Sequence, residues 1–379
     1  MDLEFAQEQD EFRSVVRDFA ENEVAPHAAI WDRDHTFPLE TVKKMGKMGL
    51  FGLIFPSTFG GSDAPFSTLC IAIEELARAD SSVAITLSAG VGLGANPIFS
   101  FGNEEQKEAY LPPLCRGESL GAFGLTEPGA GSDAGASQTR ATKVEGGYLI
   151  SGSKAFITNS GTPITSVITV TARTEEGVSA FIVESGTKGL TIEPPYRKMG
   201  WHASDTHGIS LDEVFVPDHA LLGTPGKGLA QFLSILDDGR IAISALAVGL
   251  AQGCLDESLA YAKSRIAFGK AIGSNQAVAF KLADMAVAIE AARALTYKAA
   301  ALKDAGLPFK KEAAIAKLFS SEAAVTVARE ATQIFGGAGF IDETPVARHF
   351  RDSKILEIGE GTSEIQRLVI SRELGLKLA

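Results

Sequence analysis

The chain has 379 residues, which is enough for two or three domains of ordinary size. Hydrophobic residues make up 45% and charged residues 22% of the sequence, as in a typical globular protein, and the formal net charge is −12. This acidic balance argues against nucleic acid as a partner, because phosphates require basic patches. The three cysteines stand far apart and the six histidines form no HxxxH or HExxH pattern, so unpaired thiols and no metal site are expected.

The sequence up to about residue 118 has the pattern of a helical domain. Apolar residues recur from Phe12 to Phe19 at the spacing of an amphipathic helix, and Pro26 marks the expected end of that helix. Pro112 and Pro113 are expected to close a later helix in the same way. After the first, helices are predicted over 39–50, 65–80 and 103–117.

Two segments bear on membranes and targeting. Residues 81–102 contain no charged side chain, but serines, glycines, Asn96 and Pro97 lie among them, so we expect a buried helix followed by a loop rather than a membrane span. The residues Met1–Phe5 lack the basic and apolar regions of a signal peptide. The expected location is therefore cytoplasmic, although a mature mitochondrial matrix protein would have the same pattern.

From Ser119 to about residue 222 the chain is rich in Gly, Ser, Thr and Val, which is typical of short strands joined by turns. Val167–Thr171 and Ser179–Val183 are predicted strands, and Glu145–Gly147 is the predicted turn of a hairpin. These features favour a compact β domain, either a sandwich or a barrel.

After Pro225 the composition is again helical and rich in alanine. The last helix is expected to begin near Thr362, where Ser363 and Gln366 have the spacing of a capping box. Before it, three long helices are predicted over 227–266, 275–304 and 309–335. Long helices of this kind favour an antiparallel bundle.

Two short segments carry most of the chemical information. Gly124–Asp133 reads Gly-Leu-Thr-Glu-Pro-Gly-Ala-Gly-Ser-Asp and offers backbone N–H groups and hydroxyls for a phosphate or a planar ring, although taken alone it could be a surface loop. Gly359–Gln366 reads Gly-Glu-Gly-Thr-Ser-Glu-Ile-Gln and places the carboxylate of Glu360 between two glycines before a helix start. Glycine on both sides lets a ligand approach the carboxylate and the backbone.

Together these segments resemble the acyl-CoA dehydrogenase family of flavoproteins, and Gln333–Phe340 matches a second signature of that family. The resemblance extends over essentially the whole chain. It implies an α+β multidomain fold. The expected parts are an N-terminal α-helical domain over 1–118, a middle β-barrel domain over 119–225 and a C-terminal four-helix bundle domain over 226–379.

The resemblance also implies the reaction, which is FAD-dependent α,β-desaturation of an acyl-CoA thioester to a trans-2-enoyl-CoA in fatty acid β-oxidation. Glu360 is the expected catalytic base for the α-proton, while the β-hydrogen leaves as hydride to flavin N5. Electron-transferring flavoprotein is the expected acceptor. The alternatives are an acyl-CoA oxidase that uses O2 and a non-catalytic scaffold, and the presence of Glu360 counts against the scaffold.

The FAD contacts implied by the resemblance come from separate parts of the chain. The residues around Phe156 are expected to line the flavin ring. Arg265 is expected to hold the pyrophosphate, because the planar guanidinium of arginine can bind a phosphate through two hydrogen bonds. In the family, residues 265–276 and 333–337 contact a flavin bound mainly by a neighbouring subunit, which implies a homotetramer. The residues expected to bind FAD are Phe123, Leu125, Thr126, Gly131, Ser132, Phe156, Ile157, Thr158, Arg265, Phe268, Gln276, Gln333, Ile334, Phe335, Gly336, Gly337, Thr362, Ser363 and Glu364.

Substrate contacts are implied at a second set of positions. Asp237 and Asp238 are interpreted as a helix start, and Arg240 as the contact for the anionic nucleotide end of the ligand. Gly239 stands where the isovaleryl branch of the family has its catalytic glutamate, so that branch is rejected. The residues expected to bind the acyl-CoA are Ser132, Asp237, Asp238, Gly239, Arg240, Gly361 and Ile365.

The clearest departure from the family pattern is Gly359, where many members have tyrosine immediately before the catalytic glutamate. The expected substrates carry short to medium acyl chains. Residues 84–100 and the start of the helix over 227–266 are expected to form the floor of the acyl pocket.

Overall fold

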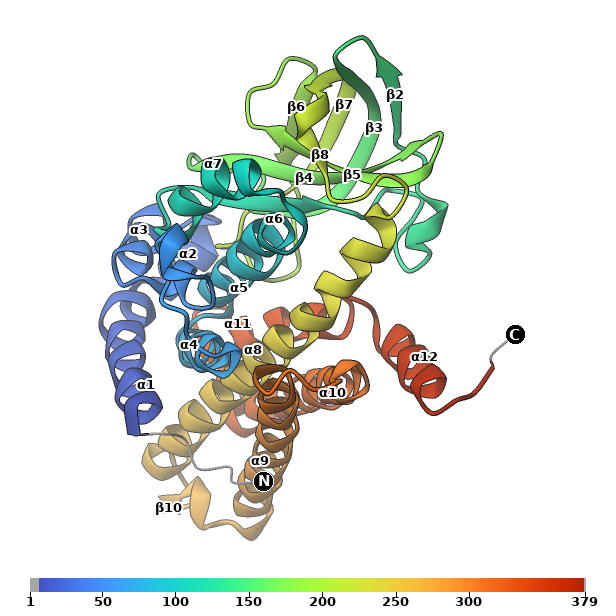
Figure 1. Ribbon diagram of the computed structural model, residues 1–379. Coiled ribbons are helices and arrows are strands. Elements are labelled where there is room, and N and C mark those ends of the chain that lie inside the picture. The colour runs from blue at the N-terminus through green and yellow to red at the C-terminus, as the bar shows by residue number, and fades with distance from the viewer. Residues whose placement is uncertain (1–6, 378–379) are drawn as a thin grey trace.

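The computed structural model describes residues 7–377, so the prediction made for Met1–Phe5 lies outside the described part. Helices form the first and last parts of the chain, and a β-sheet formed by the middle part lies at one end of the molecule (Figure 1). The helices of the first part are α1 (Gln7–Phe19), α2 (Ala25–Asp34), α3 (Leu39–Lys47), α4 (Phe66–Ala79), α5 (Ser81–Ala89), α6 (Asn96–Phe101) and α7 (Glu104–Cys115).

Prolines occupy different places in these helices than the sequence pattern indicated. Helix α1 ends before a π-helical turn over Ala20–Val24, and Pro26 lies in the first turn of α2, where its missing N–H leaves no helical hydrogen bond unmade. Pro112 and Pro113 lie inside α7 rather than after it. Their carbonyl groups accept hydrogen bonds from N–H groups just beyond the helix, so they take part in ending it from within.

The uncharged segment is helical along nearly its whole length, so the expected loop was wrong. Between α5 and α6 the chain forms a π-helical turn over Gly90–Ala95, which packs against the strand β1 (Leu120–Gly124) and the helix α8 (Gly228–Ser264). Within residues 7–377, Ser81–Phe101 is the one stretch long and apolar enough to cross a membrane by length and composition. However, 89% of its most apolar window is buried inside the protein, and a core position accounts for its lack of charge.

The middle part forms one eight-stranded sheet. Its strands follow the order β6-β7-β3-β2-β4-β5-β8, and β1 lies parallel beside β4. The two strands predicted from sequence are confirmed within β4 and β5, and the predicted turn joins β2 to β3 at Gly146, whose φ is 76°. The strands after β1 are β2 (Arg140–Val144), β3 (Gly147–Thr158), β4 (Thr165–Thr174), β5 (Gly177–Glu184), β6 (Leu190–Pro195), β7 (Thr206–Pro217) and β8 (Leu221–Leu222).

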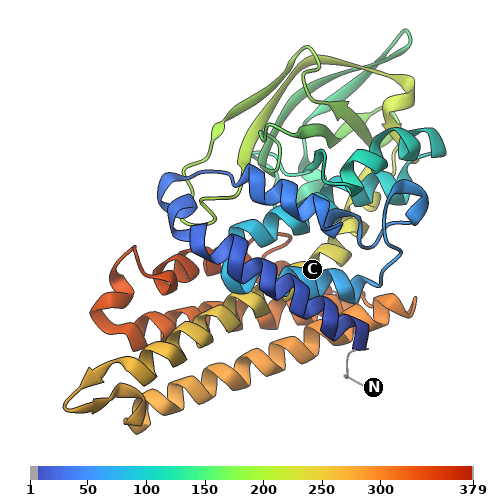
Figure 2. The same cartoon turned by 90° about the vertical axis from the view of Figure 1, so that its left-hand side faces the viewer.

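The three long helices predicted for the last part are confirmed. They are α8, α9 (Gln276–Asp304) and α10 (Lys310–Phe335), which lie side by side (Figure 2). A short hairpin of β9 (Ile266–Ala267) and β10 (Lys270–Ala271) joins α8 to α9. The chain continues through α11 (Pro345–Ser353) and α12 (Ser363–Glu373).

Two details of the helix starts differ from the sequence analysis. Asp237 and Asp238 lie about three turns inside α8, because helix-forming residues continue without interruption from the start of that helix. The start of α12 near Thr362 is confirmed, but the capping residue is Thr362 rather than Ser363. The Thr362 hydroxyl accepts a hydrogen bond from the N–H of Ile365 at 3.3 Å.

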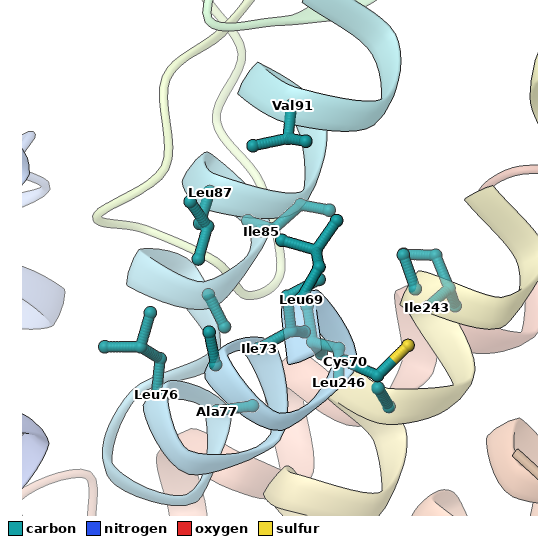
Figure 3. Packing of buried hydrophobic residues seen from close by; sticks show 14 of the residues in the cluster. Leu69, Cys70, Ile73, Leu76, Ala77, Ile85, Leu87, Val91, Ile243 and Leu246 are labelled. Atoms are coloured by element: carbon teal, nitrogen blue, oxygen red, sulfur yellow. The ribbon is translucent and has the colours of Figure 1, made fainter. Parts of the chain in front are cut away.

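Helices α4, α5 and α8 share one apolar core. Leu69 and Cys70 of α4, Ile85 of α5, and Ile243 and Leu246 of α8 are all buried within it and gather in one place (Figure 3). All three cysteines of the chain are buried and unpaired. The core thus links helices of the first and last parts of the chain into one body.

Helix α4 crosses α8 closely, and the residues of α8 at the crossing are glycines. A Cβ atom at Gly249 would lie 2.1 Å from the carbonyl oxygen of Glu74, and one at Gly253 would lie 2.4 Å from that of Arg78. Both distances are far below van der Waals contact. Glycines one turn apart on α8 therefore permit this crossing, and the neighbouring backbone atoms occupy the space of the absent side chains.

We expect Gly249→Ala to destabilise the fold by about 1–3 kcal/mol, because the added methyl group must push two backbones apart. Gly92→Ala is the control, since a Cβ there meets no atom within 4 Å. Thermal unfolding of both variants measures the effect. Equal midpoints for the two variants would show that the crossing tolerates a side chain.

Candidate active site

The carboxylate of Glu360 lies against α8 just before α12 begins. Its Oε2 atom is buried and has no hydrogen-bond partner among the described residues. Burial raises the pKa of Glu360 to about 7, while the positive charges of Lys317 and Arg240 act in the opposite direction. A carboxyl group with this pKa exchanges its proton near neutral pH, which is what a general base requires.

Helix α8 makes room for this carboxylate at Gly239. A Cβ atom at that position would lie 1.8 Å from Glu360 Oε2, so any other residue would collide with the carboxylate. The glycine that separates the sequence from the isovaleryl branch thus has a steric role of its own. It lets the Glu360 side chain rest on the helix backbone.

The backbone at Glu360 is held in an uncommon conformation. Glu360 and Gly361 have φ angles of 52° and 97°, in the region that residues other than glycine seldom adopt. Two buried donors bind the carbonyl oxygen of Gly361, which are Lys317 Nζ at 2.7 Å and Gln366 Nε2 at 2.8 Å. Neither donor was assigned a role in the site from the sequence, and a lysine amid the alanines of α10 was the only signal.

Arg240 and the acidic pair form a charged group near the base. Arg240 is only 5% exposed and pairs with Asp237, one turn before it on α8. Asp238 pairs with Lys303 of α9 at 2.7 Å. The contact of Arg240 with an anionic nucleotide stays a prediction. Within the chain, its charge acts on the carboxyl group of Glu360.

The loop Gly124–Asp133 is anchored from inside by Glu127, which the sequence analysis did not single out. The Glu127 carboxylate accepts hydrogen bonds from the N–H groups of Gln138 at 2.5 Å and Thr139 at 3.0 Å, and from Nζ of the buried Lys154 at 2.8 Å. Burial favours the neutral form, but these donors prevail and bring the pKa of Glu127 down to about 2. The ionised side chain therefore fixes the inner face of the loop.

The outer face of the same loop is open to solvent. Gly131 and Ser132 are exposed and Thr126 is half-buried, whereas Leu125 lies in the core. The ring of Phe123 stacks on an aromatic ring of α8 with centroids 4.2 Å apart. A ligand can therefore meet the backbone and hydroxyls of this loop, while the apolar side chains hold the loop to the fold.

Strand β3 turns one aromatic ring outward beside the loop. The N–H of Ala155 donates to the carbonyl of Thr126 at 2.9 Å, which joins the strand to the loop. Phe156 has a φ of 61° where the pairing of β3 and β7 shifts register, and it is 65% exposed. Thr158 is half-buried. Ile157 is 2% exposed in the sheet core, so only its backbone can reach a ligand on this face.

The second group of predicted FAD contacts lies at the far end of the molecule from the sheet. Arg265, Phe268 and Gln276 are exposed around the hairpin of β9 and β10 (Figure 1). The end of α10 joins them, since Phe335 stacks on Tyr261 of α8 with centroids 4.1 Å apart. Within one chain this group is therefore remote from the loop and from Phe156. At the end of α10, Gln333, Gly336 and Gly337 are exposed, and Ile334 and Phe335 are buried.

The first turn of α12 carries the remaining predicted site residues. Ser363 is buried and Ile365 is half-buried, whereas Glu364 is exposed. Hydrogen bonds to its own backbone N–H and to Thr362 lower the pKa of Glu364, as expected for a carboxylate at a helix start. Glu364 is thus a weaker base than Glu360, whose pKa is raised.

Family models match nearly the whole chain. The N-terminal domain of acyl-CoA dehydrogenases matches residues 6–118, the middle domain residues 122–214 and the C-terminal domain residues 226–375. The order of helical, β and helical parts and the glutamate with a buried carboxyl oxygen before the last helix agree with this match. The chain belongs to the acyl-CoA dehydrogenase family.

Relatives share the full length of the chain. The probable acyl-CoA dehydrogenase YngJ of Bacillus subtilis is 52% identical over 99% of this chain and 100% of its own length. The structure of butyryl-CoA dehydrogenase from Megasphaera elsdenii has a TM-score of 0.96 at 44% identity, with 99% of this chain and 100% of that chain covered. A chain from a structure of the electron transferring flavoprotein of Acidaminococcus fermentans has a TM-score of 0.97 at 42% identity, with 99% of each chain covered.

A further solved structure bears on the cofactor. An acyl-CoA dehydrogenase complexed with FAD from Bacillus anthracis has a TM-score of 0.94 at 35% identity, with 98% of this chain and 67% of that chain covered. FAD is therefore the cofactor of this family fold.

We expect Gly239→Ala to lower acyl-CoA dehydrogenase turnover by about 10²-fold or more, because the methyl group displaces the carboxylate of the base. Combining it with Glu360→Asp, which shortens the carboxylate by one methylene, should recover part of that loss. Steady-state rates of both single variants and the double variant measure the coupling. Additive losses in the double variant would show that Gly239 and Glu360 do not compete for the same space.

Proposed function

We propose that the protein catalyses the FAD-dependent α,β-desaturation of an acyl-CoA thioester to a trans-2-enoyl-CoA, with Glu360 as the catalytic base. The observation that carries the proposal is the buried Oε2 of Glu360, which has no hydrogen-bond partner in the described chain and belongs to a carboxyl group with a pKa of about 7. A structural carboxylate would be paired. An unpaired one near neutrality is suited to taking a proton from a substrate.

The residues around the site fit the cofactor. The outward ring of Phe156 forms an aromatic wall, the loop beside it presents backbone N–H groups at Gly131 and Ser132, and the guanidinium of Arg265 suits a pyrophosphate. FAD, when bound, accepts the β-hydrogen of the substrate as hydride. Glu360 takes the α-proton onto its carboxylate. The backbone N–H of Glu360 is the proposed donor that polarises the thioester carbonyl and so acidifies the α-carbon.

The substrate we propose is a short-chain acyl-CoA, as for the butyryl-CoA dehydrogenase among the relatives. Residues 84–100 belong to helical segments that pack against α8, and we propose that they form the floor of the acyl pocket with its first turns. Ser132 and Gly361 are the proposed contacts along the thioester, and Ile365 adds apolar surface. Asp237 and Asp238 set the charge around the base rather than bind the ligand directly.

We propose domain boundaries near residues 118 and 225, supported by the ranges of the three family-model matches. The finer architecture proposed is a β-barrel for the middle part and a four-helix bundle for the last. The barrel is proposed from the family resemblance, and the packing of α8, α9, α10 and α12 supports the bundle.

An oligomer is proposed because the two groups of predicted FAD contacts lie at opposite ends of one chain, so that a complete site draws on at least two chains (Figure 1). That this oligomer is a homotetramer is proposed from the family resemblance. Electron-transferring flavoprotein is the proposed electron acceptor, supported by the similarity to a chain solved in such a structure. The cytoplasmic location stays a prediction from the sequence. Transfer of electrons to O2, as in an oxidase, is the alternative to this acceptor.

We expect Glu360→Gln to retain FAD and bind acyl-CoA, but to lose at least about 10²-fold in turnover, because the amide cannot accept the α-proton. Anaerobic bleaching of the flavin absorption by butyryl-CoA measures this step. In the unchanged protein the rate should rise as pH increases through about 7, since only the ionised carboxylate acts as base.

Glu364→Gln is the matched control for that variant, because it removes an exposed carboxylate four residues away while Glu360 stays in place. Compared at equal FAD content, it should bleach at nearly the normal rate. Bleaching by Glu360→Gln at the unchanged rate would remove the basis of the proposal. Rapid return of the absorption in air, without an added acceptor, would identify an oxidase.

We expect Gly359→Tyr to reduce activity selectively on α-branched acyl-CoAs and to spare straight short chains. A Cβ at Gly359 meets only ordinary contacts, at 3.4 Å to the carbonyl oxygen of Ile355, so a side chain can be attached without backbone collision. The tyrosine ring would fill space near the acyl chain that the glycine leaves open. The ratio of kcat/KM for straight and α-branched substrates in both proteins measures this, and an unchanged ratio would contradict it.

A further inference from the structure

We propose that Lys317 is a positioning residue for the base. Its buried ammonium fixes the left-handed turn at Glu360 and Gly361 and supplies the positive charge that faces the Glu360 carboxylate. This inference rests on the proposed role of Glu360 in catalysis. The sequence analysis assigned Lys317 no role, and it contacts the turn from α10 rather than from the segment that carries the base.

Lys317 holds the turn at Glu360 and Gly361 through a hydrogen bond. Lys317 has no exposed surface, and its Nζ donates to the carbonyl oxygen of Gly361 at 2.7 Å. Glu360 has a φ of 52°, a backbone conformation that is unfavourable for a residue other than glycine. Such a conformation persists only where surrounding contacts enforce it. Lys317, together with Gln366, provides those contacts at the next residue.

Two cations, Lys317 and Arg240, act on the carboxylate of Glu360. Arg240 is paired with Asp237, so its charge is largely compensated. The hydrogen bond of Lys317 goes to a neutral carbonyl. Of the groups that affect Glu360, the ammonium of Lys317 comes first after burial itself. The cation with the least compensation is therefore the one bound to the turn of the base.

Other charged groups face the turn from the elements packed around it. The 3₁₀ turn before it carries Glu357, which pairs with Lys354 at 2.5 Å, and α12 carries the exposed Glu364. On α8, Asp238 is paired with Lys303 of α9. These carboxylates favour the charged form of Lys317 or disfavour that of Glu360, but Glu357 and Asp238 are each paired with a cation and Glu364 is exposed to solvent.

Glu360 and Lys317 titrate in the same pH range. Burial raises the pKa of Glu360 to about 7 and lowers the pKa of Lys317 to about 8, while each group opposes the shift of the other by its charge. Two groups this close in pKa and coupled by charge titrate as a pair. Removing the ammonium should therefore raise the pH at which the base becomes ionised.

The test compares Lys317→Met with Gln366→Met in the holoenzyme. Both variants remove a donor to the same carbonyl oxygen of Gly361, but only the first removes a charge. The acid limb of the kcat/KM pH profile should move upward by about 1 unit or more in Lys317→Met. In Gln366→Met the limb should stay in place while kcat falls, because only the turn is loosened.

A second variant separates charge from folding. Lys317→Gln keeps a donor and loses the charge, so it should show the same upward shift even if Lys317→Met does not fold. Lys317→Arg keeps the charge, so the acid limb of its kcat/KM pH profile should lie close to that of the unchanged protein. Infrared titration of the protonated carboxyl band of Glu360, identified by its absence in Glu360→Gln, gives the same shift without relying on turnover.

The outcomes distinguish this inference from the proposed function. Near-normal turnover of Glu360→Gln would overturn the role of the base and the inference with it. If Glu360→Gln is inactive but the acid limb and the infrared titration stay unchanged in folded Lys317→Gln, the inference alone is overturned. Equal upward shifts in Lys317→Met and Gln366→Met would also overturn it, because they would assign the effect to the turn rather than to the charge.

Discussion

The arrangement of the protein depends on how closely other backbones and one carboxylate approach the helix α8. This helix begins against β5 of the sheet and runs to the hairpin at the opposite end of the molecule (Figure 1). At Gly249 it admits the carbonyl of α4, and at Gly239 it admits the carboxylate of Glu360. Glycines on α8 therefore both allow the first and last parts of the chain to pack together and make room for the carboxylate of Glu360.

The buried carboxyl group of Glu360 has an energetic cost that the rest of the fold must offset. Raising the pKa of Glu360 from 4.5 to about 7 corresponds to roughly 3 kcal/mol against the ionised form. Because the folded pKa is raised, this cost is absent below pH 4.5, grows as the pH increases to about 7 and stays constant above. The left-handed turn adds strain. Burial of apolar side chains in the core shared by α4, α5 and α8 stabilises the fold and offsets both the cost of the buried carboxylate and the strain of the turn.

Much of the fold could be predicted from the sequence, because periodicity and turn chemistry are local signals, whereas the role of Glu360 as the base stays a prediction. The long helices and the hairpin at Gly146 follow from such signals, and two glycines mark Glu360. The errors have non-local causes. Asp237 and Asp238 looked like a helix start, but their charges are compensated by Arg240 and by α9. The site residues that were missed act through burial. Glu127 and Lys317 are polar in sequence, and only tertiary packing shows that their side chains point inward.

The exposed aromatic residue Phe268, in the second group of predicted FAD contacts, is consistent with assembly from several chains. Phe268 is fully exposed with a φ of 51°, so the chain holds an apolar ring in solvent in a conformation that is itself unfavourable. Such a combination is stabilised only if another surface covers the ring. In the proposed homotetramer, the FAD of a neighbouring chain covers the ring of Phe268. The loop Gly124–Asp133 and Phe156 of that neighbouring chain hold the other part of the same FAD. Because the cofactor then touches two chains, its binding stabilises the assembly, and the assembly in turn completes the site at which Glu360 acts.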